Sequence, residues 1–268
     1  MNGRSARYSP TAHRSARAWS FMAAWFLRYF RRHMSALRIA AWGTPATGAG
    51  TGPLVVYSNH PSWWDAAIYI LLAHRLFPGH QGYAPIDAAM LRRYRFFAHI
   101  GAFPVDLDHP RGAASFLRAS ADVLSRPDRA LWIAAQGRFA DVRERPLSLR
   151  AGVGRLPELA PDAQFVPLAV EYAFWNERGA EALAAFGPPI NGRELLALPR
   201  TDRLARLESA LTATMDRLAG DAVTRDAARF VPVVEGTVGV GGFYDAWRRL
   251  RALLRGRRFD PAHGSSGP

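Results

Sequence analysis

The chain has 268 residues, 49% of them hydrophobic, and a formal net charge of +13 at pH 7. This length is enough to bury one large core, and the strong positive charge predicts an anionic partner, such as an acidic membrane surface, a nucleic acid or a phosphorylated substrate. Because the sequence contains neither cysteine nor lysine, it excludes thiol nucleophiles, disulfides, thiolate metal sites, P-loop lysines and Schiff-base lysines.

The N-terminal part of the chain is predicted to be helical. Residues 1–15 are polar and basic, and we expect them to form a flexible tail. A helical pattern follows from Ala16 to Trp42, so we assign an amphipathic, membrane-associating helix to residues 16–45. Its apolar side is wide and aromatic and its polar side is basic, which is typical of helices in a membrane interface. A helix packed on the core of an α/β domain shows a similar pattern, and one helix can do both.

Four short apolar runs, each followed by polar or glycine-rich residues, then alternate with helical patterns. The runs span residues 53–58, 101–107, 130–135 and 165–172, with further candidate strands at 81–86 and 182–186. The helices between them are expected at 63–76, 88–99, 112–124 and 152–160. This alternation predicts an α/β domain over residues 46–235, with a mostly parallel central sheet flanked by helices. The carboxyl ends of such strands line one crevice, where we expect the functional site.

Two more helices are predicted towards the C-terminus. A polar helix from Arg200 to Ala219 is expected to cover the edge of the domain. After a glycine-rich linker, residues 243–258 combine an apolar stripe with many arginines, which predicts a basic amphipathic helix that binds an anionic membrane or docks on the core. No segment contains the ~18 uncharged apolar residues needed to span a bilayer, and no signal peptide is evident. We therefore expect a cytoplasmic protein, peripherally associated with the cytoplasmic face of the membrane.

The first predicted strand of the α/β domain leads into a possible acid–base pair. His60 follows this strand directly, and Asp65 comes five residues later at the start of a helical pattern. Histidine suits general base catalysis because the unperturbed pKa of imidazole lies near neutrality. A carboxylate on the other ring nitrogen holds the tautomer and stabilises the imidazolium. The dipole of the helix favours an ionised carboxylate in its first turn. His60 and Asp65 are therefore the candidate catalytic residues.

The segment Asn59-His60-Pro61-Ser62-Trp63-Trp64-Asp65 resembles the His-x4-Asp motif of the glycerolipid acyltransferases of the 1-acylglycerol-3-phosphate type. Other blocks of that family have similar counterparts here in the same order, at residues 101–106, 136–137, 149–152 and 166–170. The resemblance covers about residues 50–190. It implies direct acyl transfer with His60 as general base and Asp65 as its partner. Acyl-CoA or acyl carrier protein would be the co-substrate, and we expect no metal and no cofactor.

The blocks that contact the acceptor in this family differ in the present chain. Where the family usually has Glu-Gly-Thr-Arg, this sequence has Gln136-Gly137-Arg138-Phe139, and Leu107 replaces an arginine that holds the phosphate of the acceptor. Other arginines can take over that contact, because a guanidinium binds phosphate in a bidentate manner. The candidate substrate-binding residues are therefore Gln136, Gly137, Arg138, Arg111, Arg143 and Arg150, and Arg145 offers the same chemistry.

The sequence thus predicts a membrane-associated O-acyltransferase that moves a fatty acyl group from a thioester to a lysophospholipid-like or other lipid hydroxyl. A sugar or lipid alcohol as acceptor is an open alternative. A second alternative, favoured by Gln136 and Leu107, is a catalytically inactive protein of the same fold that binds lipid or membrane. Nucleic-acid binding rests on charge alone, since no recognition module is evident. We expect an anionic membrane surface and no nucleic acid as partner.

Overall fold

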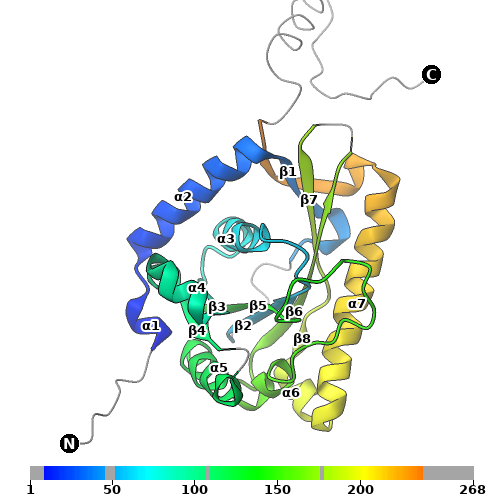
Figure 1. Ribbon diagram of the computed structural model, residues 1–268. Helices are drawn as coiled ribbons and strands as arrows, with labels where there is room; N and C mark the ends of the chain where they lie inside the picture. The colour runs from blue at the N-terminus through cyan, green and yellow to red at the C-terminus, as the bar shows by residue number, and fades with distance from the viewer. Residues whose placement is uncertain (1–8, 46–51, 107–108, 176–177, 238–268) are drawn as a thin grey trace, which may run out of the picture.

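The computed structural model describes residues 9–45, 52–106, 109–175 and 178–237 (Figure 1). The predicted helix at 243–258 lies outside these residues. The strands are β1 (Met34–Ala40), β2 (Leu54–Ser58), β3 (Gln81–Asp87), β4 (Ala102–Val105), β5 (Arg129–Ala134), β6 (Gln164–Ala173), β7 (Ala180–Phe186), β8 (Ile190–Asn191) and β9 (Phe230–Glu235). The α-helices are α1 (Pro10–His13), α2 (Ala16–His33), α3 (Asp65–Leu76), α4 (Ala88–Arg93), α5 (Pro110–Val123), α6 (Gly192–Leu196) and α7 (Arg200–Thr224).

A nine-stranded sheet forms the centre of the protein, in the order β4-β3-β5-β2-β6-β7-β1-β9, with β8 paired to β6. Strands β4, β3, β5, β2 and β6 are parallel to one another. Beyond them β7 is antiparallel to β6, β1 is parallel to β7, and β9 is antiparallel to β1. The prediction of an α/β fold with a mostly parallel central sheet flanked by helices is therefore confirmed.

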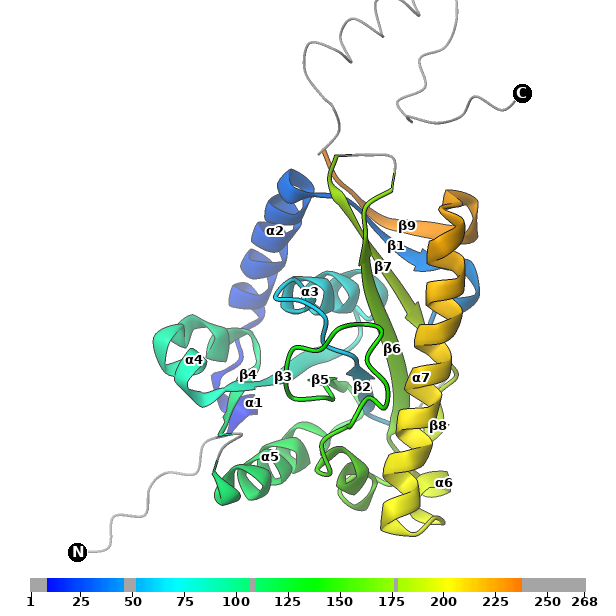
Figure 2. The same ribbon diagram turned by 45° about the vertical axis from the view of Figure 1, so that its right-hand side comes forward.

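Hydrophobic cores lie on both faces of the sheet. Val55 and Tyr57 of β2 point to the face covered by α5 and α7, whereas Val56 points to the face covered by α2 and α3. This alternation follows from the two-residue period of a strand, and burial of both faces explains why the strands are almost continuously apolar. Figure 2 shows α2 and α3 on one side of β6 and β7, with α7 on the other.

The long predicted N-terminal helix is wrong beyond His33. Helix α2 ends there, and Met34–Ala40 forms β1 in place of further helix. The segment is extended because it lies between β7 and β9, which satisfy its backbone groups on both sides and bury Leu37 and Ile39. A short 3₁₀ turn, Ala41–Gly43, follows.

Smaller differences concern other helices. Residues 9–15 of the expected flexible tail include α1, which is held to the domain because Ser9 and Thr11 donate hydrogen bonds to Asp122. The helix predicted at 88–99 is divided into α4 and a 3₁₀ helix at Arg95–Ile100, and the one at 152–160 is a 3₁₀ helix at Val153–Glu158. Within the described ranges no helix is both long enough and apolar enough to cross a membrane.

Candidate active site at the carboxyl end of the sheet

The turn that carries His60 is anchored to the neighbouring strand by Asn59. The β2–β6 ladder ends at the pair Ser58 and Leu168, but β6 continues to Ala173. Asn59 extends the ladder with its side chain: its Nδ2 donates to the Val170 carbonyl at 2.8 Å, and its Oδ1 accepts from the Val170 N–H at 2.9 Å. Both groups are buried, so the pairing holds the chain rigidly where it leaves the sheet.

His60 and Asp65 form the predicted pair. The His60 Nδ1 lies 2.6 Å from Asp65 Oδ2, which also accepts a bond from the Ser62 N–H at 3.2 Å. Asp65 is fully buried and is the first residue of α3, so the helix dipole stabilises its negative charge. A carboxylate only accepts hydrogen bonds, which places the ring proton on Nδ1 and the lone pair on Nε2. The His60 side chain remains 23% exposed, so the ring is partly accessible from solvent.

Tyr172 completes this arrangement from β6. Its hydroxyl donates to Asp65 Oδ1 at 2.6 Å, so both carboxylate oxygens are bonded. Burial raises the pKa of the Tyr172 hydroxyl well above its ordinary value, and the negative charge of Asp65 is the second cause. The hydroxyl is therefore neutral at physiological pH and acts as a constant donor. Tyr172 orients Asp65, which in turn orients His60.

Gln136 holds the backbone of the His60 turn by hydrogen bonds. Its Oε1 accepts the His60 backbone N–H at 3.0 Å, and its Nε2 donates to the Leu147 carbonyl at 3.2 Å. The Leu147 N–H in turn donates to Glu208 of α7 at 2.9 Å. A chain of hydrogen bonds thus connects α7, the loop around Leu147, Gln136 and the backbone of His60. Gln136 is 3% exposed. The structure therefore gives it a supporting position, in contrast to the predicted contact with substrate.

Gly137, Arg138 and Arg150 lie next to this turn. Gly137 has a φ of 63°, a left-handed conformation that favours glycine, and the Arg150 side chain packs closely against it. Arg138 is ion-paired with Glu144. The next residue, Phe139, places its ring 4.4 Å from that of His60 at 32°, and it is 59% exposed. The segment after β5 therefore forms one wall beside the imidazole.

The remaining predicted arginines differ in the partners that they have. Arg143 binds Asp141 with two parallel hydrogen bonds of 2.8 Å, which hold the pKa of the Asp141 carboxyl well below its ordinary value. Arg145 is ion-paired with Asp216. Arg150 forms no ion pair within the described ranges. Arg111 lies in the first turn of α5, and no hydrogen bond or ion pair between described residues joins it to the His60 turn.

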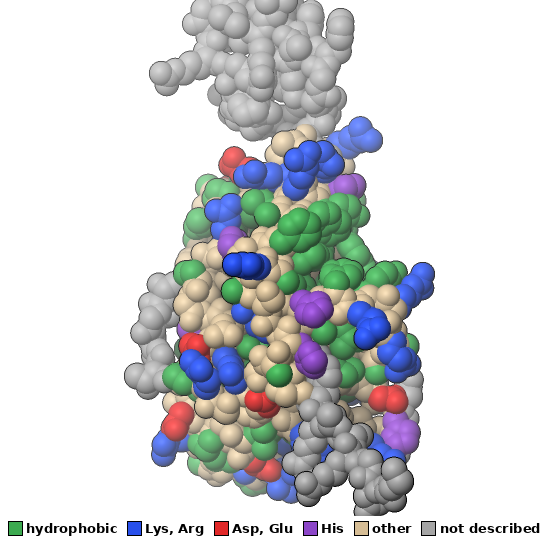
Figure 3. Space-filling model, turned by 90° about the vertical axis from the view of Figure 1, so that its left-hand side faces the viewer, with side chains coloured by type: hydrophobic (Ala, Val, Ile, Leu, Met, Phe, Trp, Pro, Cys, Tyr) green, Lys and Arg blue, Asp and Glu red, His purple; other side chains and the backbone are tan. Residues whose placement is uncertain are grey.

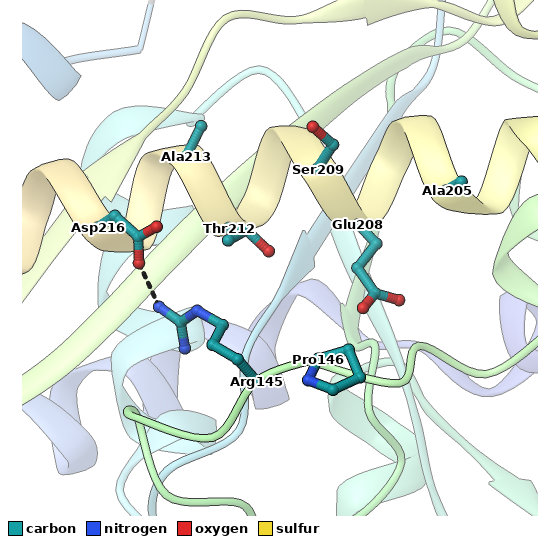
Figure 4. A pocket seen from close by; sticks show the side chains of 8 residues that line it. All are labelled: Arg145, Pro146, Ala205, Glu208, Ser209, Thr212, Ala213 and Asp216. Atoms are coloured by element: carbon teal, nitrogen blue, oxygen red, sulfur yellow. Dashed lines mark hydrogen bonds and ion pairs between the residues drawn. The ribbon is translucent and has the colours of Figure 1, made fainter.

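A cleft of about 820 Å³ opens beside the pair, between α7, the 141–145 loop and the end of β6. We call it the α7 cleft. Pro61 and Tyr172, which adjoin His60 and Asp65, line its inner end. A second hollow, of about 730 Å³, lies farther along α7 (Figure 4). There Arg145 reaches toward Asp216. Neither lining includes His60 or Asp65 themselves, but that of the α7 cleft includes their neighbours Pro61 and Tyr172, and that of the second hollow does not. The first cleft is therefore the one that adjoins the chemistry.

Sequence reasoning missed several residues of this site. Asn59 belongs to the quoted motif, but its role depends on the greater length of β6. Tyr172 and Phe139 become visible only when the register of β6 and the path of the loop after β5 are known. The described residues contain no cluster of three or more His, Asp or Glu side chains suited to a metal ion. Comparison with known proteins finds no family profile and no curated sequence that matches the chain.

Proposed function

We propose that this protein is a membrane-associated O-acyltransferase that uses an acyl thioester, either acyl-CoA or acyl carrier protein, and a lipid hydroxyl as acceptor. The observation that carries the proposal is the His60–Asp65–Tyr172 arrangement, which holds a partly exposed imidazole at the carboxyl end of a mostly parallel sheet. The resemblance of residues 59–65 to the His-x4-Asp motif of glycerolipid acyltransferases supports the same reaction.

The chemistry requires one proton acceptor at a fixed place. The acceptor hydroxyl donates its proton to His60 Nε2 while its oxygen attacks the thioester carbonyl, so that a C–O bond forms. The tetrahedral intermediate then collapses, the C–S bond breaks, and the imidazolium returns the proton to the leaving sulfur. Asp65 stabilises the imidazolium in both steps. The absence of cysteine and of a Gly-x-Ser-x-Gly motif fits direct transfer, without an acyl-enzyme.

Membrane association is supported by the outward face of α2. Met22, Phe26 and Phe30 of this helix are buried against the domain, whereas Phe21 and Trp25 are 69% and 45% exposed. The same outward stripe carries Arg17, Arg28, Arg31 and Arg32, all of them exposed. Figure 3, which views the side of the molecule that carries α2 and α4, shows hydrophobic side chains gathered there with basic residues at the margins. Such a surface suits an anionic membrane interface.

This surface is continuous with the motif that carries His60. The Trp25 and Tyr29 rings stack at 5.1 Å, and Tyr29 stacks on Trp64 at 5.3 Å. Trp63, which is 54% exposed, then meets Trp64 edge to face. Aromatic side chains therefore lead from α2 to the residues between His60 and Asp65. A membrane that binds this face would lie close to the imidazole. We expect the protein to bind the cytoplasmic face of that membrane.

The test is acyl transfer by purified protein with a matched histidine control. Thiol released from acyl-CoA is measured with a thiol reagent, which meets no protein thiol because the chain lacks cysteine. We expect His60→Ala to abolish release, and His74→Ala, an exposed substitution in the last turn of α3, to leave it unchanged. Full release by correctly folded His60→Ala protein would refute the proposal. Wild-type protein that binds vesicles but releases no thiol would favour a lipid-binding role.

A further inference from the structure

The α7 cleft is placed to hold a substrate of the proposed reaction. Pro61 directly follows the proposed base, and Tyr172 donates to its carboxylate partner, so the cleft adjoins the residues next to the pair. Its volume of about 820 Å³ suits a small molecule or a lipid headgroup. The wall formed by α7 is mostly apolar, with Met215, Leu218 and Val223 beside the single carboxylate Asp216.

The charge of the cleft is opposite to that of the protein as a whole. The chain has a net charge of +13, yet the charged residues of the cleft are two arginines, Arg143 and Arg145, and three carboxylates, Asp141, Glu171 and Asp216, which sum to −1. Both arginines are already ion-paired, Arg143 with Asp141 and Arg145 with Asp216. A phosphate in the cleft would therefore find no unpaired guanidinium and would lie near a third carboxylate.

That third carboxylate, Glu171, has no partner in the described part of the chain. It lies on β6 directly before Tyr172, lines the cleft and is half-buried. Burial raises the pKa of the Glu171 carboxyl above its ordinary value. No described residue donates a hydrogen bond to this side chain. An acyl chain at this place would leave the carboxylate unsatisfied, whereas a hydroxyl would donate to it.

We propose, on the basis of the acyltransferase function above, that the α7 cleft binds an acceptor headgroup that is uncharged and rich in hydroxyls, with Glu171 accepting a hydrogen bond from one of them. The hydroxyl to be acylated then points past Tyr172 toward His60. A glycerol phosphate headgroup is disfavoured, because its charge repels that of Glu171. The two arginines of the cleft are each paired with a carboxylate, which agrees with an uncharged headgroup.

Two acceptors with the same acyl tail test the proposal: a monoacylglycerol glucoside and a 1-acylglycerol 3-phosphate. We expect wild-type protein to prefer the glucoside by at least about tenfold in kcat/KM. Glu171→Gln should raise the KM for the glucoside by about tenfold, with kcat nearly unchanged, since one charge-assisted hydrogen bond is weakened. Glu171→Arg should change the cleft from −1 to +1 and reverse the preference. Asp162→Arg, an equal change of charge at an exposed carboxylate outside the cleft, should reverse nothing.

The outcomes separate this inference from the proposed function. Transfer that favours the phosphate acceptor, or that Glu171→Gln and Glu171→Arg leave unchanged, would overturn the inference while the acyltransferase function stands. Absence of transfer to any acceptor would overturn the function instead. The affinities of both lipids for His60→Ala protein, measured by calorimetry, then still decide the headgroup class, because this substitution leaves the cleft intact. Tighter binding of the glucoside supports the inference, and tighter binding of the phosphate overturns it.

Discussion

Replacing Gln136 with glutamate exchanges a buried amide for a carboxylate of almost the same shape, at a position where the two ends of the amide have opposite roles. Its Oε1 accepts the His60 N–H at 3.0 Å, and its Nε2 donates to the Leu147 carbonyl at 3.2 Å. An ionised glutamate keeps the first bond and loses the second. It also brings a negatively charged oxygen toward a carbonyl oxygen in a site that is 3% exposed.

The cost follows from these contacts. A buried carbonyl without its donor costs about 1–3 kcal/mol, and a charged group raises the figure. We therefore expect Gln136→Glu to lower the free energy of unfolding by about 3 kcal/mol at pH 7.5. A protonated carboxyl can donate to Leu147 and avoid this cost, so the folded state raises the pKa of the new glutamate. A 3 kcal/mol effect corresponds to a shift of about two pH units above an unfolded value near ~4.3.

The assay is urea unfolding of wild-type and variant protein between pH 4 and pH 8. Because the folded pKa of the new glutamate lies above its unfolded value, the variant is expected to match wild type near pH 4 and to lose stability as pH rises toward 7. Gln164→Glu, a half-buried residue at the start of β6, is the control for added charge and should show little change. Equal stability of Gln136→Glu and wild type at every pH would refute the supporting role of Gln136.

Three further outcomes are expected. Asp65→Asn should lower kcat by about 10³–10⁴-fold in the thiol-release assay while the protein stays folded, because asparagine favours the wrong imidazole tautomer. A decrease in kcat of less than tenfold would contradict the proposed role of Asp65 as partner of His60. Tyr172→Phe should move the acid limb of the pH profile of kcat/KM to higher pH by as much as about one unit, which corresponds to about 1.4 kcal/mol, because the carboxylate then stabilises the imidazolium more strongly. Tyr57→Phe removes a buried hydroxyl that is bonded to a distant carbonyl, and it should leave the profile unchanged. Trp25→Ser should weaken binding to anionic vesicles about tenfold, and Val231→Ser, on β9, should leave it unchanged.

Much of the fold was predictable because its strands are buried on both faces. Runs such as Leu131–Ile133 are apolar throughout and are bounded by turn residues, so their type and approximate ends follow from local pattern. Met34–Ala40 is interrupted by Ser35 and Arg38, and it follows the helical pattern of α2 without a glycine or proline between them. Its extended form depends on β7 and β9, which lie far away in the sequence.

From the order of the amino acids alone, the His60–Asp65 pair could be proposed, because the two residues lie only five apart, on a turn and at the first residue of the helix that follows it. The roles of Gln136 and Tyr172 are different. They meet the motif across 76 and 107 residues, and only the sheet order β5-β2-β6 and the greater length of β6 place them there. The negative charge of the α7 cleft is likewise a tertiary property, since pairing of each arginine with its carboxylate depends on where α7 and the 141–145 loop pack.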